Sequence, residues 1–283
     1  MLWLKPIGDL DGLWDDTWLE QTSPEKLTSW VTRQRVFKVI TNHLPDQAKV
    51  VEAGCGLGHW VCALRQCGYN AVGIDTSRVG IENGRRLYNL NQDILREGNV
   101  LALEYLDNSF DAYVSLGVVE HFLEGPVLAL KEAHRVLKEG GLLFCSVPYL
   151  NLLRIMFTER FDPNMSDTSG YGFYQWSFTK EEMEATLKSA GFEVIRIFPY
   201  ATIKTFWEVI PGFRSVTDRI MARATAVNAS NLEKAKISSP RPSVTIKSLL
   251  KGSAALLLEG LLTRKLAGHM CMYVCKKKRG SRL

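Results

Sequence analysis

Glycines at alternate positions near residue 55 could hold a ligand directly against the backbone. Glu52 is followed by Gly54, Gly56 and Gly58. Glycine lets the main chain approach a ligand where any side chain would collide with it. Asp75 follows Gly54 by 21 residues, and a carboxylate at the end of a second strand can accept hydrogen bonds from both hydroxyls of a ribose. The spacing therefore predicts a site for a ligand that contains ribose.

A dinucleotide is a weaker candidate for this ligand. A dinucleotide-binding turn has the spacing G-x-G-x-x-G, with the following helix pointing at a pyrophosphate. In this chain the third glycine comes one residue early, and His59 and Trp60 fill the next two positions. The spacing disfavours a dehydrogenase.

Alternating strand and helix patterns from residue 49 onward must position these residues. Such alternation predicts an α/β fold with a doubly wound, mostly parallel sheet of seven strands. The expected end of the fourth helix is Gly140–Gly141, and Thr179 and Glu182 form a capping box for the fifth. We expect strands at 49–53, 70–75, near 94–101, 110–116, 142–147, 192–198 and 269–275, and helices before 49 and at about 58–67, 77–90, 128–137 and 179–191.

The chain divides into four predicted parts. Residues 1–45 are expected to form an N-terminal helical cap, and 46–200 a Rossmann-like core. Residues 201–267 form an insertion, which is far longer than the ~4 to 6 residues of an ordinary connection. Residues 268–283 are expected to form the last strand and a basic tail.

Charge is distributed unevenly along the chain. Residues 1–199 carry 19 basic and 26 acidic side chains (net 7 negative), whereas residues 200–283 carry 16 basic and 4 acidic (net 12 positive). This asymmetry indicates an acidic partner for the C-terminal third. Residues 247–266 are apolar with cations toward both ends, so they are expected either to cover the ligand crevice as a lid or to lie on an anionic membrane surface.

Three sequence features bear on where the protein resides in the cell and on whether it binds a metal. The first residues lack the features of a signal peptide, and the apolar run 254–262 is shorter than the ~20 residues of a membrane-spanning helix. The six cysteines form no C-x-x-C pair. We expect a cytoplasmic protein with reduced thiols and no metal.

Three further segments, 98–111, 116–121 and 133–141, follow the glycine turn in a recognisable order. They read GNVLALEYLDNSFD, LGVVEH and AHRVLKEGG. Together with the turn they resemble the class I S-adenosylmethionine-dependent methyltransferases, from about residue 50 to 200 and again near 269. The resemblance implies the methyltransferase Rossmann-like fold with an antiparallel last strand, S-adenosylmethionine as cofactor and S-adenosylhomocysteine as product.

The resemblance also implies which residues hold the cofactor. Glu52 and the glycine backbone would hold the amino-acid part, Asp75 the ribose and Asn99 the adenine amino group. Asn99 stands where the family usually has aspartate, but an amide oxygen accepts the same hydrogen bond. The implied set is Glu52, Gly54, Cys55, Gly56, Gly58, Asp75, Thr76, Asn99, Val100, Leu116 and Gly117.

Candidate catalytic and substrate residues follow the fourth and fifth strands. Glu120 and His121 could supply a general base for an oxygen or nitrogen acceptor, although a histidine here could equally pack against a helix. An aromatic segment after the fifth strand is expected to form the substrate wall, with packing on the core as the alternative. The candidate substrate residues are Tyr149, Arg154, Tyr171, Tyr174, Gln175 and Trp176.

The leading functional interpretation is methyl transfer to an oxygen, nitrogen or carbon of a small-molecule, glycan or lipid-linked acceptor. A nucleic-acid methyltransferase is an alternative because of the basic C-terminal third, but no N/D-P-P-Y/F/W motif follows residues 110–116. A non-catalytic scaffold that binds the cofactor is a third interpretation. The sequence assigns no oligomeric state.

Overall fold

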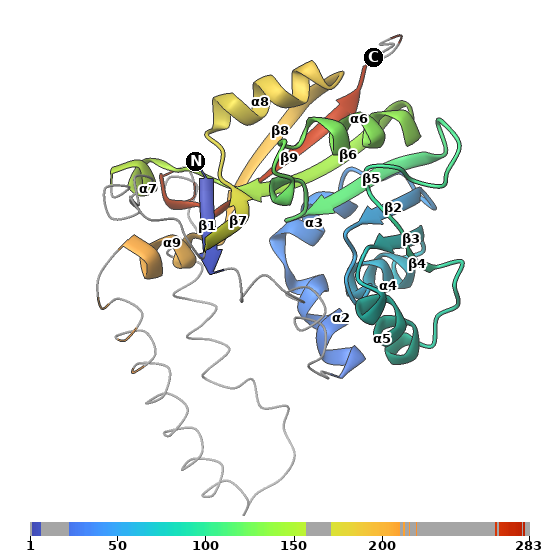
Figure 1. Cartoon of the computed structure of the whole chain (residues 1–283). Coiled ribbons are helices and arrows are strands. Elements are labelled where there is room, and N and C mark those ends of the chain that lie inside the picture. Colours follow the sequence, from blue (N-terminus) through green and yellow to red (C-terminus); the bar gives the residue numbers. More distant parts are fainter. Residues whose placement is uncertain are drawn as a thin grey trace, which may run out of the picture. The chain divides into compact units, whose positions relative to one another are not determined.

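The computed structural model describes residues 2–6, 23–156, 171–209, 212, 215, 219, 264, 266–278 and 280. Most of these residues belong to a seven-stranded sheet and the helices around it (Figure 1). The sheet has the strand order β4-β3-β2-β5-β6-β9-β8. Its strands are β2 (Lys49–Ala53), β3 (Asn70–Asp75), β4 (Leu95–Glu97), β5 (Phe110–Leu116), β6 (Leu137–Pro148), β8 (Phe192–Tyr200) and β9 (Met270–Lys277).

The sheet confirms the predicted fold class. The printed pairings β3–β4, β2–β3, β2–β5 and β5–β6 are all parallel, and β9 runs antiparallel to β6 (Figure 1). The chain order reverses between β2 and β5, because β3 and β4 lie on one side of this pair and β6 on the other. Ligands of open α/β sheets bind outside the carboxyl ends of the strands at such a reversal.

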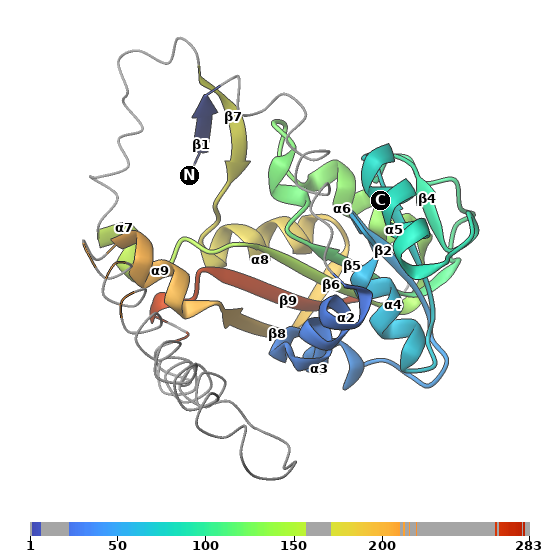
Figure 2. The ribbon, with the colours of Figure 1, turned by 90° about the horizontal axis from the view of Figure 1, so that it is seen from below.

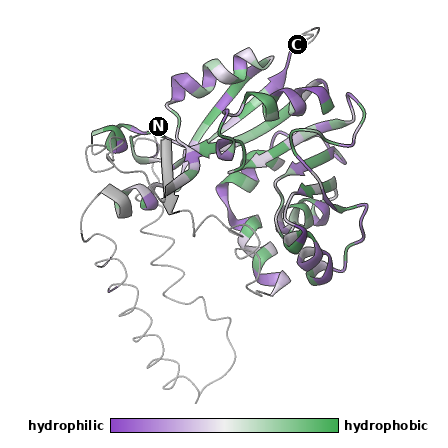
Figure 3. Ribbon diagram, viewed as in Figure 1, coloured by the Kyte–Doolittle hydropathy of each residue, from purple (hydrophilic) through white to green (hydrophobic). Residues whose placement is uncertain are grey.

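Helices cover both faces of the sheet. Helix α8 lies on one side of β8 and β9, and α3 lies on the other (Figure 2). The apolar residues concentrate on the central strands and on the inner sides of the helices (Figure 3). The helices are α2 (Pro24–Arg33), α3 (Arg35–Thr41), α4 (His59–Gln66), α5 (Arg78–Tyr88), α6 (Val127–Val136), α7 (Leu152–Met156), α8 (Lys180–Ser189) and α9 (Thr202–Val209), with a 3-10 turn η2 (Val119–His121).

Local capping explains where several helices begin. Ser77 caps α5 by accepting a hydrogen bond from the backbone N–H of Gly80 at 2.9 Å. Thr179 and Glu182 form the predicted capping box of α8, with both reciprocal hydrogen bonds present. These caps satisfy backbone donors that a helix start otherwise leaves without partners.

One strand begins earlier than the sequence predicts. Strand β6 starts at Leu137 rather than at 142, so Gly140 and Gly141 lie inside the strand and do not end it. The pairing register with β5 shifts between Phe110 and Ala112. A side chain at Gly141 would lie 2.8 Å from the carbonyl oxygen of Lys138, and Gly140 has a φ of 75°. The two glycines therefore accommodate an irregular entry into the strand.

The predicted helical cap at 1–45 needs a correction at its start. Residues 24–41 are helical, but β1 (Leu2–Pro6) is a strand. It pairs antiparallel with β7 (Tyr171–Trp176) in a separate two-stranded sheet, with an irregularity between Trp3 and Leu4. The backbone groups of this segment find their partners about 170 residues away, so local sequence patterns could not reveal the strand.

The chain separates into two compact units. The first comprises residues 1–149, 163–198 and 271–283, and the second comprises 150–162 and 199–270. Within the second unit, the Asn151 amide donates hydrogen bonds to Thr205 Oγ1 at 3.1 Å and to the Gly268 carbonyl at 2.9 Å. Nearly all of the predicted apolar segment at 247–266 lies outside the described residues.

Candidate functional site

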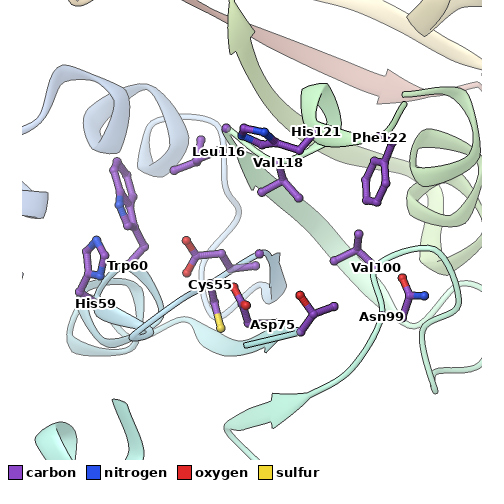
Figure 4. Close-up of a pocket in the computed structure, with 14 residues that line it drawn as sticks. Cys55, His59, Trp60, Asp75, Asn99, Val100, Leu116, Val118, His121 and Phe122 are labelled. Carbon is purple, nitrogen blue, oxygen red and sulfur yellow. The ribbon is translucent and has the colours of Figure 1, made fainter. Parts of the chain in front are cut away.

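A cavity of about 380 Å3 opens at the carboxyl ends of the central parallel strands (Figure 4). Its walls come from the turns after β2 and β3, the segment after β4, and the segment after β5. Nine of the eleven predicted cofactor residues line it; the exceptions are Gly56 and Gly58. The lining residues are Glu52, Gly54, Cys55, His59, Trp60, Asp75, Thr76, Asn99, Val100, Leu116, Gly117, Val118, His121 and Phe122.

The glycine turn between β2 and α4 needs glycine for two different reasons. Gly54 has a φ of 78°, and a side chain there would collide with Val118 on the opposite wall of the cavity. Gly58 has a φ of 72° and precedes α4, where a side chain would lie 2.6 Å from Leu95 of β4. Gly54 therefore allows the Val118 side chain to pack directly on the turn, whereas Gly58 allows the turn to pack against the sheet.

The Asp75 carboxylate joins the turns after β2 and β3. Its Oδ2 atom accepts a hydrogen bond from the backbone N–H of Gly56 at 2.7 Å, and its Oδ1 atom accepts one from Ser77 at 2.8 Å. Gly56 therefore acts through Asp75, although it does not line the cavity. Each carboxylate oxygen has more than one lone pair, so these bonds are compatible with further hydrogen bonds from a ligand.

Glu52 places a carboxyl group in the wall of the cavity, near Asp75. Its side chain is 3% exposed, and its Oε2 atom has no hydrogen-bond partner among the residues that the structure describes. Burial, and next the negative charge of Asp75, raise the pKa of Glu52 well above its usual value, while a backbone hydrogen bond from Val61 acts in the opposite direction. A positively charged ligand group would stabilise the ionised form of this carboxyl.

Asn99 and Val100 form the cavity wall after β4. Asn99 Oδ1 accepts a hydrogen bond from the backbone N–H of Leu101 at 2.9 Å, and the Asn99 carbonyl accepts one from Ala102 at 3.0 Å. These bonds close a compact turn over residues 99–102. The side chain of Val100 is buried and belongs to the core under α6.

The structure separates the two predicted catalytic residues. His121 lines the cavity, and its Nδ1 atom lies 2.7 Å from the carbonyl oxygen of Tyr174. Glu120 does not line the cavity; its side chain is 1% exposed, and burial raises its pKa to about 8. Both belong to the 3-10 turn η2, in which successive side chains point about 120° apart. Glu120 therefore does not meet the cavity that the structure describes, which leaves His121 as the candidate base.

Comparison with known proteins agrees with this geometry. A family profile described as a methyltransferase domain matches residues 51–145. The demethylmenaquinone methyltransferase of Staphylococcus aureus is 31% identical over 187 residues, which cover 59% of this chain and 76% of the relative. The enzyme of the same name from Alkalihalophilus pseudofirmus is 29% identical over 169 residues, covering 52% of this chain and 71% of the relative.

This chain belongs to the class I S-adenosylmethionine-dependent methyltransferases. It is an enzyme of that family, and its cofactor is S-adenosylmethionine. Two solved structures share the fold. A methyltransferase of Methanosarcina mazei has a TM-score of 0.54 at 16% identity and covers 85% of this chain and 97% of its own. A methyltransferase of Archaeoglobus fulgidus has a TM-score of 0.52 at 16% identity and covers 95% of this chain and 100% of its own.

The predicted substrate residues of the methyltransferase do not line the cavity as the structure describes it. Two of them lie next to residues that do. The Tyr174 carbonyl contacts His121, and the indole N–H of Trp176 donates to the carbonyl oxygens of Phe122 at 3.1 Å and Leu123 at 3.2 Å. Strand β7 therefore fixes the backbone and the imidazole at one end of the cavity.

The other predicted substrate residues have different surroundings. Gln175 and Tyr171 pair with β1, opposite Trp3 and Pro6, and the Tyr171 side chain lies outside the described part. Tyr149 forms a parallel bridge with Phe178. Arg154 belongs to the second compact unit, where its side chain is buried and its backbone N–H donates to Asn151 Oδ1 at 2.9 Å.

Four lining residues of the methyltransferase were not predicted: His59, Trp60, Val118 and Phe122. Burial lowers the pKa of His59 to about 4, so its ring is neutral at physiological pH. The position of His59 directly after the glycine turn could have indicated from the sequence that it lines the cavity. Val118 and Phe122 flank η2, and no motif distinguishes them from packing residues.

The described part of the chain holds neither a metal cluster nor a membrane-spanning helix. No group of three or more histidine, cysteine, aspartate or glutamate side chains in that part of the chain could hold a metal ion. Among the helices described, none combines the length and the apolar character needed to cross a membrane.

Proposed function

We propose that this methyltransferase transfers a methyl group from S-adenosylmethionine to a small-molecule acceptor that binds beside His121. The observation that carries the proposal is the convergence of Glu52, Asp75 and Asn99 with His121 on one cavity of about 380 Å3. Glu52 and Asp75 lie at the carboxyl ends of β2 and β3, and Asn99 follows β4. His121 follows β5, on the other side of the reversal of the sheet.

The chemistry of the cavity fits the cofactor. The buried Glu52 carboxyl, whose Oε2 atom has no partner in the described part, suits the cationic amino group of the cofactor's amino-acid end. Gly54, which has no side chain, lines the cavity and would let that end approach the backbone. We assign the ribose to Asp75 and Thr76, and the adenine to Asn99 and Val100.

The cofactor supplies a methyl group on a positively charged sulfur that is itself the leaving group. The residues of the chain must therefore align the acceptor and exclude water. Trp60, Leu116, Val118 and Phe122 give the cavity an apolar wall, which disfavours competing attack by water. An acceptor oxygen, nitrogen or carbon atom would form its new bond to the methyl carbon while the electron pair of the carbon–sulfur bond returns to sulfur.

In this proposal His121 takes the proton that the acceptor loses. A carbonyl oxygen only accepts hydrogen bonds, so the contact with Tyr174 requires the proton on Nδ1 in the neutral ring. The Nε2 atom then carries the lone pair and can act as the base. Strand β7 thus selects the tautomer that the reaction needs.

The acceptor class is supported by the names of the relatives. Two of them are named demethylmenaquinone methyltransferases, and this chain covers 71% and 76% of their lengths. We therefore propose a small molecule as acceptor and demethylmenaquinone as the first compound to test. An assay with methyl-labelled cofactor tests this compound. Transfer of the label to a glycan, a lipid-linked compound or a nucleic acid would instead identify one of those acceptor classes.

Calorimetry tests the cofactor assignment before any acceptor is known. The chain should bind S-adenosylmethionine and S-adenosylhomocysteine, and Asp75→Ala should weaken that binding by about 1.5 to 3 kcal/mol because a charged acceptor is lost. Glu97 is an exposed carboxylate at the end of β4, and the control variant Glu97→Ala should bind both compounds as the unmodified chain does. Tight binding of NADH with no binding of either sulfur compound would reject the proposal.

We also propose that the second unit contacts an anionic membrane surface. Helix α7 exposes Leu152, Ile155 and Met156, which are 52%, 46% and 65% exposed. The C-terminal third, to which most of this unit belongs, carries a net charge of 12 positive. Exposed apolar side chains in a part of the chain with an excess of cations are typical of surfaces that lie in a membrane interface.

A further inference from the structure

A pair of charged residues on α6 holds the segment that forms the adenine end of the proposed cofactor site. Glu132 and Arg135 are three positions apart on this helix. Arg135 Nε donates to Glu132 Oε2 at 2.8 Å, and Arg135 Nη2 donates to Glu132 Oε1 at 2.7 Å. This two-bond geometry fixes the orientation of both side chains. The Glu132 side chain is 10% exposed and that of Arg135 is 34% exposed.

The same two side chains bind the backbone of the segment between β4 and β5. Glu132 Oε1 accepts a hydrogen bond from the Leu103 N–H at 2.6 Å, and Arg135 Nη2 donates to the Leu103 carbonyl at 3.0 Å. Arg135 Nη1 donates to the Tyr105 carbonyl at 2.8 Å and to the Asp107 carboxylate at 2.7 Å. The pair therefore holds both polar backbone groups of Leu103 and one of Tyr105.

Leu103 directly follows the turn that carries Asn99 and Val100. The turn is closed by bonds within residues 99–102, and it is tied to the sheet at its start by the Gly98 N–H, which donates to the Asp75 carbonyl at 2.9 Å. At its other end the bonds to Leu103 hold it against α6. The turn is thus anchored at one end by a cofactor-binding strand and at the other by Glu132 and Arg135.

Leu103 packs in the same apolar cluster as Val100, which lines the cavity. Leu103 and Val100 are both buried and belong to one apolar cluster with Ala129, Ala133 and Val136 of α6. Val100 lines the cavity. A displacement of Leu103 would therefore move the surface that we assign to the adenine ring.

We propose that Glu132 and Arg135 are positioning residues for the adenine end of S-adenosylmethionine, a role that rests on the cofactor site proposed above. The pair touches neither the cavity nor the reacting atoms. It determines how closely Asn99 and Val100 can approach the base, and therefore affects cofactor affinity but not the chemical step.

Calorimetry of Arg135→Met tests this role. The methionine keeps the apolar stem of the side chain but removes every donor. At a temperature well below its melting temperature, this variant should bind S-adenosylhomocysteine about tenfold more weakly than the unmodified chain. Binding of 5′-methylthioadenosine should weaken by a similar factor, because both compounds carry the adenine. Arg135→Lys should recover part of the loss, since one donor can still reach a backbone carbonyl.

The control is Arg78→Met, which removes an exposed ion pair with Glu82 on α5 and should leave both affinities unchanged. A purely structural role would lower the melting temperature of Arg135→Met and leave the affinities intact, which would overturn the inference. If Arg135→Met does not fold, Glu132→Gln takes its place, and an unchanged affinity in that variant likewise overturns the inference. Failure of the unmodified chain to bind S-adenosylhomocysteine would instead reject the proposed cofactor site.

Discussion

The Nδ1 atom of His121 lies 2.7 Å from the carbonyl oxygen of Tyr174, a residue 53 positions further along the chain. The two rings also meet edge to face, with 5.1 Å between their centroids. One wall of the cofactor cavity is therefore held by a strand outside the seven-stranded sheet. This relationship makes the role of His121 testable, because its orientation and its proton are both specified.

Replacing His121 by alanine should lower turnover by roughly a hundredfold or more, because the general base is lost, while cofactor affinity stays the same. The measurement is turnover together with calorimetry of S-adenosylhomocysteine in the same variant. His43→Ala is a matched control, since His43 Nδ1 also lies 2.7 Å from a backbone carbonyl, that of Val39, but His43 does not line the described cavity. A loss of melting temperature with normal turnover would show that His121 only packs.

Cofactor affinity should rise with pH because of Glu52. Burial and Asp75 raise the pKa of this carboxyl well above 4.5 in the free protein, and a bound cationic amino group would lower it again. The complex then holds fewer protons than the free protein, so binding releases protons and strengthens as the pH rises through the raised pKa. Calorimetry of S-adenosylhomocysteine in two buffers of different ionisation enthalpy measures that release. Glu52→Gln should abolish it, and equal heats in both buffers for the unmodified chain would contradict the assignment.

Stability should fall with rising pH because of Glu120. Burial raises its pKa from 4.5 to about 8 in the folded protein. Burial penalises the ionised carboxylate, so between pH 4.5 and about 8 the unfolded chain loses this proton while the folded protein keeps it. Over that range the free energy of unfolding should fall by about 1.4 kcal/mol per pH unit, and above pH 8 this contribution stays constant. Denaturant unfolding of Glu120→Gln should therefore show a weaker pH dependence than the unmodified chain. Glu124 is an exposed neighbour of Glu120, and Glu124→Gln should keep the pH dependence of the unmodified chain. The same change of unfolding free energy with pH in all three proteins would refute the prediction.

The fold was largely predictable because its signals are local. The strands at 49–53, 70–75 and 110–116 match the structure residue for residue, since each is a buried apolar run that ends at a turn. Ser77 and Thr179 marked helix starts correctly because a cap acts within three residues of itself. Strand β1 was missed because its partner is distant in sequence. The start of β6 was missed because a glycine pair indicates a helix end and a strand irregularity equally well.

The candidate site was predictable only where backbone geometry dictates residue type. Gly54 and Asp75 follow from the turn and the strand end, and both line the cavity. Glu120 and His121 are neighbours in sequence, but a 3-10 turn directs adjacent side chains apart, so only one of them reaches the cavity. Trp60 faces the cavity because of how α4 packs on α2 and α3, with its ring 6.0 Å from that of Phe37. Sequence spacing cannot specify such packing.

The proposed membrane contact predicts binding to vesicles of anionic phospholipid and not to neutral ones. Each cation near the surface would contribute about 1 kcal/mol, so high salt should release the protein. Ile155→Asp combined with Met156→Asp should weaken flotation, because both side chains are exposed on α7 and a carboxylate there would be repelled. Ile195→Asp is the matched control, since Ile195 is equally exposed, at 46%, but belongs to β8 in the first unit. Deletion of residues 244–266, which include the apolar segment 247–266, should also abolish flotation without unfolding the core. Indifference of the full chain to anionic vesicles at low salt would reject the membrane contact.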